Sequence, residues 1–272
     1  MPTQRDRELA RARSRRQAER RAAAARRRRI TTYVVSAVLV VAIVGVIIGL
    51  AATGGSNKKS NSAASSPSAT PSVTPSATTA RAVACGAKAP PAPVKQTYSK
   101  EPAMTIDTKA KYVMKIDTSC GEIDITLDAA KAPHTVNSFA FLAAKHYFDG
   151  TYFHRSVSSD GLTVLQGGDQ TGTGQGGPGY TLPDENLTGA KYPRGTLAMA
   201  NTGQAHTGGS QFFLVDKDSQ LPASYTPFGT ITPAGLAVLD KLMAIGDDGS
   251  NGTGDGKPNQ TIYIDSLTVT KS

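Results

Sequence analysis

Residues 195–215 read GTLAMANTGQAHTGGSQFFLV, a stretch in which two short apolar runs, 195–200 and 211–215, flank a Gly-rich loop. Each run is long enough for a β-strand and too short for a helix. Further short apolar runs occur at 152–157 and 162–166, and Gly-rich loops separate these as well. The pattern predicts a domain built from many short strands.

The sequence on either side extends this β-rich domain. Residues 112–116 and 122–127 alternate between apolar and polar side chains and flank a turn at 118–121, which predicts a β-hairpin. Residues 261–270 alternate again and predict a last strand.

Two helices are predicted, one before and one after the central strands in sequence. The first opens at Pro133, and its apolar residues follow helical spacing at Val136, Phe139, Ala140 and Ala143. The second has Thr232 as N-cap, Pro233 at its first position and Gly246 at its end. Its apolar residues are Leu236, Leu239, Leu242 and Met243. Many strands with only two helices indicate a closed antiparallel barrel with helices over its ends.

The net charge of +9 belongs to one end of the chain. Residues 1–29 contain twelve Arg and three acidic side chains, so the remaining 18 basic and 18 acidic side chains balance. A nucleic-acid-binding core is therefore not supported. The basic tail is interpreted as a cytoplasmic topology signal attracted to the inner leaflet.

Residues 30–52 predict a transmembrane helix. These 23 residues carry no charge, and as a helix they would be about 34 Å long, enough to cross a hydrocarbon core of about 30 Å. Because the Arg block precedes them, the N-terminus is expected in the cytoplasm and the rest of the chain outside, at the cell membrane. A cleaved signal peptide is the alternative, but both the basic and the apolar regions are long for one.

Residues 53–104 are rich in Ser, Thr, Ala and Pro, which predicts a disordered extracytoplasmic linker, and 105–272 are expected to form the folded domain. Cys85 and Cys120 lie on the exported side, where disulfides persist, so they could form a bridge across 35 residues. Two free thiols are the alternative.

Conventional cofactor and metal sites are not supported by the sequence. The four His lack metal-ligand spacing. Residues 172–177 match GxGxxG, but Pro178 and Gly179 follow instead of a helix. Residues 247–255 resemble a calcium loop in composition but lack its ligand order and closing Glu, so they are interpreted as a flexible connection. No cofactor and no metal are expected.

Five motifs are specific when taken together. They are Phe153-His154-Arg155, Gln166-Gly167-Gly168-Asp169, Met199-Ala200-Asn201, Gly209-Ser210-Gln211-Phe212-Phe213-Leu214 and Phe228-Gly229. In this order and spacing they resemble the cyclophilin family of peptidyl-prolyl cis–trans isomerases, from Lys111 to Val269. With the Arg-rich tail and apolar segment, the chain resembles the membrane-anchored cyclophilins of actinobacteria. The resemblance implies an eight-stranded antiparallel β-barrel capped by two α-helices.

The resemblance also implies the residues of an isomerase site. Arg155 would donate to the proline nitrogen in the twisted transition state, and Gln166 would orient the guanidinium and hold the substrate carbonyl side. The substrate-binding residues implied are Phe153, Met199, Ala200, Asn201, Gln211, Phe213, Leu221 and Tyr225. The implied partners are proline-containing polypeptides folding outside the cytoplasm, and the catalytic domain is expected to be monomeric.

The chain also departs from the family. Thr163 stands where the family commonly has a Phe, Gln220 where many members have Trp, and Tyr225 replaces a frequent His. These changes remove aromatic surface, so weaker turnover and poor binding of cyclosporin-type ligands are expected. The alternative function is a binding module that holds proline-containing segments without useful turnover.

Overall fold

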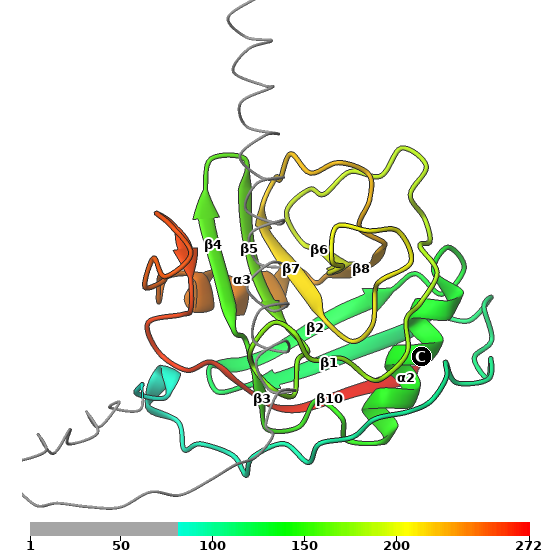
Figure 1. Ribbon diagram of the computed structural model, residues 1–272, viewed down its shortest axis with the longest axis horizontal. Helices are drawn as coiled ribbons and strands as arrows, with labels where there is room; N and C mark the ends of the chain where they lie inside the picture. The colour runs from blue at the N-terminus through cyan, green and yellow to red at the C-terminus, as the bar shows by residue number, and fades with distance from the viewer. Residues whose placement is uncertain (1–80) are drawn as a thin grey trace, which may run out of the picture. The chain divides into compact units, whose positions relative to one another are not determined.

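The computed structural model describes residues 81–272 (Figure 1). The predicted basic tail at 1–29, the transmembrane helix at 30–52 and the first part of the linker lie outside the described residues. Within 81–272, no helix combines the length and the apolar character needed to cross a bilayer.

The described residues contain one short 3-10 helix, two α-helices and ten strand segments. They are η1 (Ala84–Gly86), β1 (Tyr112–Thr118), β2 (Gly121–Leu127), α2 (Pro133–Ala144), β3 (Thr151–Tyr152), β4 (Arg155–Ser159), β5 (Leu162–Gly167), β6 (Thr196–Met199), β7 (Phe212–Lys217), β8 (Pro227–Ile231), α3 (Pro233–Met243), β9 (Asp255–Gly256) and β10 (Tyr263–Lys271).

The strands form one antiparallel sheet in the order β3-β10-β1-β2-β8-β6-β7-β5-β4-β9. The chain between β3 and β4 closes this sheet, because Phe153 N–H donates to the Ile262 carbonyl and His154 N–H donates to the Gln166 carbonyl. When the two-residue β9 is set aside and β3 and β4 are taken as one bent strand, the remaining segments make eight strands around the barrel. The predicted mostly-β barrel is confirmed.

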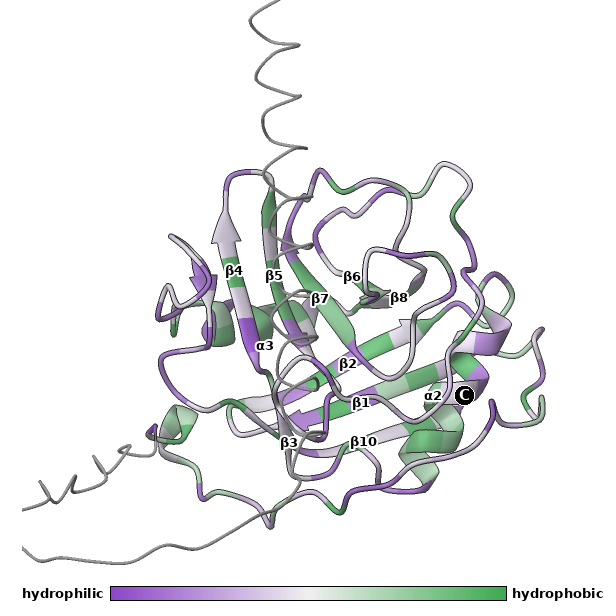
Figure 2. Ribbon diagram, in the orientation of Figure 1, coloured by the Kyte–Doolittle hydropathy of each residue, from purple (hydrophilic) through white to green (hydrophobic). Residues whose placement is uncertain are grey.

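The β1–β2 hairpin follows the predicted alternation. Tyr112 pairs with Leu127 and Thr118 with Gly121, and Gly121 has a φ of 129°, which favours glycine in the turn. Figure 2 shows hydrophobic and hydrophilic residues alternating along both strands. The fully buried apolar residues of the hairpin are Met114, Ile116, Ile123 and Ile125. One face of the hairpin therefore belongs to the core.

Both predicted helices are confirmed, and each begins at its proline. Helix α2 packs on β10 and α3 packs on β2 and β7 (Figure 1). The Thr232 hydroxyl accepts from Gly235 N–H, as predicted for the N-cap of α3. Helix α2 is capped instead by a residue far away in the sequence. The Glu185 carboxylate accepts hydrogen bonds from the N–H groups of His134 and Thr135. A negative charge at this helix end also suits the helix dipole.

Residues 82–104, here called the strap, differ from the predicted linker because they lie against the domain. Ala84 is buried and its N–H donates to the Thr261 carbonyl. Tyr98 donates its N–H to the Pro178 carbonyl and packs edge-on against Phe141, with ring centroids 4.9 Å apart. The composition of the strap offers little to bury, and it is held by backbone hydrogen bonds, by one aromatic ring and by side-chain bonds such as that from Gln96 Nε2 to the Lys145 carbonyl.

A disulfide joins the strap to the β1–β2 turn. The Cys85 and Cys120 sulfur atoms are 2.07 Å apart, across a separation of 35 residues. The predicted pairing is therefore present in the structure. It anchors the strap near its first residue.

Loss of this disulfide is expected to lower the free energy of unfolding by about 3 kcal/mol, because the unfolded chain regains the entropy of an open loop. Urea unfolding of the oxidised chain, the reduced chain and the Cys85→Ser/Cys120→Ser variant measures the effect. Reductant should leave the double variant unchanged. Equal midpoints for the oxidised chain and the double variant would contradict the prediction.

Candidate active site

The two predicted catalytic residues face each other across the β4–β5 ladder. Arg155 pairs with Gln166 in the register of the two strands, so their side chains emerge on the same face of the sheet. The Arg155 Nη1 group donates to Gln166 Oε1 over 3.4 Å. The sequence motifs thus place the amide where it can orient the guanidinium.

A third residue, Asp255, holds the other side of the guanidinium. Arg155 Nε donates to Asp255 Oδ1 over 2.8 Å and Nη2 donates to Oδ2 over 2.5 Å. This bidentate bond is the main reason why the pKa of Arg155 is raised. Burial alone would raise the pKa of Asp255, but hydrogen bonds from Arg155 and Asn251 hold it below its usual value. Arg155 therefore stays charged and Asp255 stays ionised.

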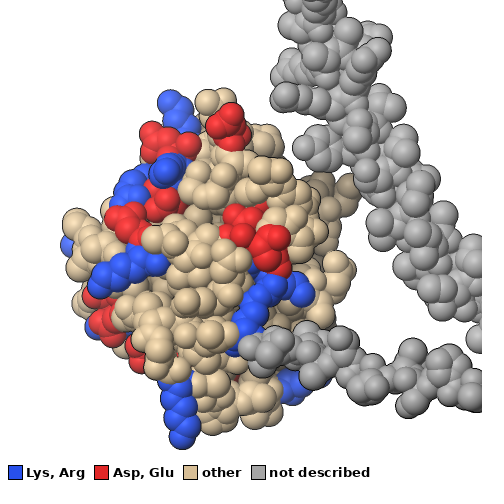
Figure 3. Space-filling view, turned by 90° about the vertical axis from the view of Figure 1, so that its left-hand side faces the viewer, with Lys and Arg blue, Asp and Glu red and all other residues tan. Residues whose placement is uncertain are grey.

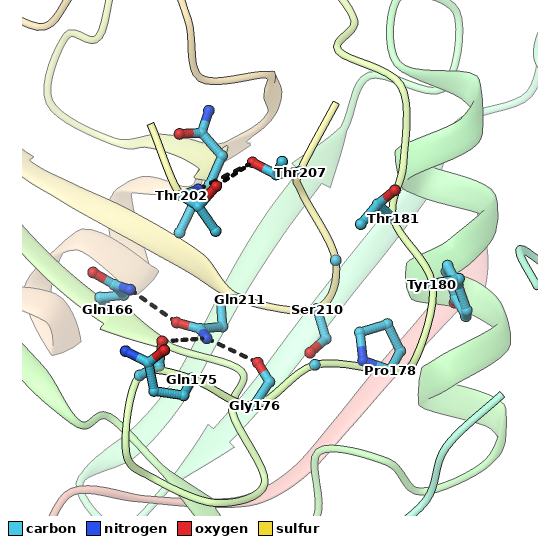
Figure 4. Close-up of a pocket in the computed structure, with 15 residues that line it drawn as sticks. Gln166, Gln175, Gly176, Pro178, Tyr180, Thr181, Thr202, Thr207, Ser210 and Gln211 are labelled. Carbon is cyan, nitrogen blue, oxygen red and sulfur yellow. Dashed lines mark hydrogen bonds between the residues drawn. The ribbon is translucent and has the colours of Figure 1, made fainter. Parts of the chain in front are cut away.

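A hydrogen-bonded line of amides continues from Gln166 into a neighbouring loop (Figure 4). Gln166 Nε2 donates to Gln211 Oε1 over 3.0 Å. Gln211 Nε2 in turn donates to the carbonyls of Gly174 and Gly176, over 3.0 and 2.8 Å. Both Gln side chains are thus fixed, and the loop 171–176 is connected to Arg155 through them.

The buried carboxylate of Asp169 organises that loop. It accepts hydrogen bonds from the N–H groups of Thr171, Thr173, Gly174 and Gly176, at distances from 2.7 to 3.1 Å. Burial alone would raise the pKa of Asp169, but these donors outweigh it and the pKa is lowered. A Cβ at Gly176 would lie 1.8 Å from Asp169 Oδ1, so only glycine fits there.

An apolar cavity of about 130 Å³ opens beside Arg155 and Gln166. Its remaining lining residues are Leu162, Val164, Ala200, Asn201, Phe213, Leu221 and Tyr225. The Phe213 and Tyr225 rings meet edge-to-face, with centroids 5.6 Å apart. The structure thus brings together seven of the ten residues implied by the resemblance, and a small apolar ring fits a cavity of this kind.

A second, larger cavity of about 520 Å³ shares Gln166, Ala200 and Asn201 with the first (Figure 4). Gln211 lies in its wall, together with loop residues 174–177 and Thr202 and Thr207. All of its lining side chains are uncharged. The two cavities therefore adjoin one another along these three shared residues.

Two predicted binding residues lie behind the site. Phe153 and Met199 are 1% and 3% exposed and belong to the main core. The Phe153 ring packs edge-on against Phe212, with centroids 6.0 Å apart. Their contribution is therefore to support the strands that carry the cavity lining.

Several residues of the site were missed from the sequence. Leu162 and Val164 share a face with Gln166 because strand side chains repeat every two residues, a signal that was present in the pattern. No pattern in the sequence around Tyr192 indicated that this residue supports the site. Its hydroxyl donates to the Tyr225 carbonyl over 2.8 Å and accepts from Tyr225 N–H over 3.0 Å, so it fixes the backbone of a cavity residue.

On the described part of the face shown in Figure 3, basic and acidic side chains are interspersed rather than gathered by sign. Within residues 81–272, no group of three or more His, Cys, Asp or Glu could hold a metal ion.

Comparisons with known proteins agree with these observations. Residues 113–269 match the family described as "Cyclophilin type peptidyl-prolyl cis-trans isomerase/CLD". A "Probable peptidyl-prolyl cis-trans isomerase B" of Mycobacterium leprae is 46% identical over 164 residues, which cover 56% of this chain and 55% of its own. A "Peptidyl-prolyl cis-trans isomerase" of Helicobacter pylori is 39% identical over 150 residues, covering 52% of this chain and 90% of its own.

A solved structure is similar as well. The cyclophilin type peptidyl-prolyl cis-trans isomerase of Cryptosporidium parvum superposes with a TM-score of 0.53 at 32% identity, covering 60% of this chain and 99% of its own. The chain spans about half the length of the mycobacterial relative. The barrel, the motifs and the matched family agree, and this chain belongs to the cyclophilin-type peptidyl-prolyl cis–trans isomerases.

Proposed function

We propose that this chain catalyses cis–trans isomerisation of Xaa-Pro bonds in exported polypeptides, from a position anchored in the cell membrane by residues 30–52. The observation that carries the proposal is a fixed guanidinium, Arg155, at an apolar cavity of about 130 Å³. The Arg-rich tail and the apolar segment support the anchored topology.

The proposed mechanism needs no bond to be made or broken. Rotation of an Xaa-Pro amide loses resonance and crosses a barrier of about 18–20 kcal/mol. At the twisted geometry the proline nitrogen regains a lone pair, which can accept a hydrogen bond. Arg155 donates to that nitrogen and so binds the transition state better than either planar isomer.

The other residues of the site hold the substrate. Phe213, Leu221 and Tyr225 enclose the proline ring. Gln166 and the Ala200 and Asn201 region hold the peptide on either side, where the larger cavity accepts a neighbouring side chain. A structure of the Cryptosporidium parvum relative in the presence of the dipeptide Ala-Pro supports a proline-containing substrate class.

The test is cis-to-trans relaxation of a short Xaa-Pro peptide at about 10 °C, where the uncatalysed process takes minutes. The full chain is expected to accelerate it. Phe213→Ala, which removes the wall of the proline cavity, is expected to lower kcat/KM about tenfold by weakening binding. A folded chain that binds the peptide without acceleration would instead establish a proline-peptide binding module.

A further inference from the structure

We propose that Asp255 is a positioning residue for Arg155, one that fixes the plane of the guanidinium and so selects the N–H groups that reach the proline nitrogen. The inference rests on the proposed isomerase function. Asp255 is not itself a lining residue of either cavity, and it reaches the site through its bonds to Arg155. It lies 100 residues along the chain from its partner.

The hydrogen bonds of Arg155 leave few donors free. A guanidinium has five N–H groups. Asp255 takes one from Nε and one from Nη2, and Gln166 takes one from Nη1. One N–H on each terminal nitrogen remains for a substrate. Because three bonds on two sides fix the plane, these two donors have a set direction.

Asp255 is itself held in place by a folded loop. Its strand β9 pairs with β4, where Val157 lies opposite Asp255, and Asn251 Nδ2 donates to Asp255 Oδ1 over 3.1 Å. Asp248 stabilises the loop by accepting hydrogen bonds from the N–H groups of Ser250 and Lys257. It also forms a salt bridge with Arg81. The segment 247–255, interpreted from its composition as a flexible connection, is thus an ordered support for one carboxylate.

The pair has a predictable kinetic consequence. Orientation of a donor before the reaction lowers the barrier, because no rotational freedom is lost at the transition state. The planar ground state makes little use of that donor, so its affinity should depend weakly on Asp255. Loss of the carboxylate should therefore reduce turnover on the protein and leave peptide affinity nearly unchanged.

The experiment compares Asp255→Ala and Asp255→Asn in the full chain. Two-dimensional NMR exchange gives the isomerisation rate of bound peptide, and chemical-shift titration gives its dissociation constant. Asp255→Ala is expected to lower the on-protein rate about tenfold with a dissociation constant within about twofold of the original. Asp255→Asn keeps one acceptor oxygen and should fall in between. Circular dichroism checks that each variant is folded.

Asp240→Ala is the matched control, because it removes a carboxylate from a different arginine, Arg194, away from the cavities. It should leave both quantities unchanged. A normal on-protein rate in Asp255→Ala would overturn the inference while the isomerase function stands. An equal loss of rate and affinity would also overturn it, since Asp255 would then shape the cavity. A wild-type chain without catalysis would overturn the proposed function and this inference together.

Discussion

Replacement of Arg155 by alanine is expected to lower kcat/KM for Xaa-Pro isomerisation by at least about 100-fold, equivalent to about 2.7 kcal/mol of transition-state stabilisation. The reason is that Arg155 is the charged donor lining the apolar cavity, and it is held there before substrate arrives. Peptide affinity should change much less, because a planar amide nitrogen is a poor acceptor. Peptide relaxation and titration on the same samples measure both quantities.

Arg155→Lys separates charge from geometry. Lysine keeps the positive charge but lacks the planar fork that bonds to Asp255 and Gln166 at once. We expect it to recover little of the lost rate. Recovery to near the original rate would show that a charge alone suffices and would contradict the directional mechanism.

The pH dependence follows from the same pair. The pKa of Asp255 is lowered and that of Arg155 is raised, so both stay charged across the neutral range. Activity should therefore be flat between roughly pH 6 and 8. It should fall only in acid, as Asp255 becomes protonated below its ordinary range.

The sequence predicted the parts of the fold that depend on local periodicity. The β1–β2 hairpin and the two proline-initiated helices follow from side-chain alternation and from helix-start residues, which act over a few residues. The family motifs likewise predicted that Arg155, Gln166 and Phe213 meet. Their register is set by strand pairing between β4, β5 and β7.

The missing parts are contacts between segments far apart in sequence. Asp255 lies in a stretch whose Asp, Gly and Asn content is that of a loop, and composition does not reveal what a loop carboxylate will bond. The strap was missed for a related reason. Its many Ala and Pro residues offer no apolar pattern. The backbone bonds that hold it, such as Tyr98 to Pro178, cannot be predicted from side-chain periodicity.

Asp169→Asn is expected to lower the free energy of unfolding by about 3 kcal/mol. The Asp169 carboxylate is fully buried and accepts four backbone N–H bonds. An amide replaces one acceptor oxygen by an NH₂ group that faces donors. Urea unfolding measures the loss, and Asp160→Asn, at the exposed β4–β5 turn, is the control that should change little.

The pH dependence of the free energy of unfolding is a second test of the role of Asp169. The folded-state pKa of Asp169 is lowered, so its contribution is present above the ordinary carboxyl pKa and is lost as pH falls through the folded value. Asp169→Asn should remove this part of the acid destabilisation. A variant that loses stability with acid as steeply as the original chain would contradict the assignment.

Any effect of Asp169 on catalysis should depend on Gln211. The Gln211 side chain is hydrogen-bonded both to Gln166 and to the loop that Asp169 organises. Asp169→Asn alone is expected to lower kcat/KM a few-fold as the Gln166 amide loses its anchor. In a Gln211→Leu background, which has already cut this connection, the same change should cost little further activity. Additive losses in the double variant would mean that the loop acts on the substrate directly, through the wall of the larger cavity.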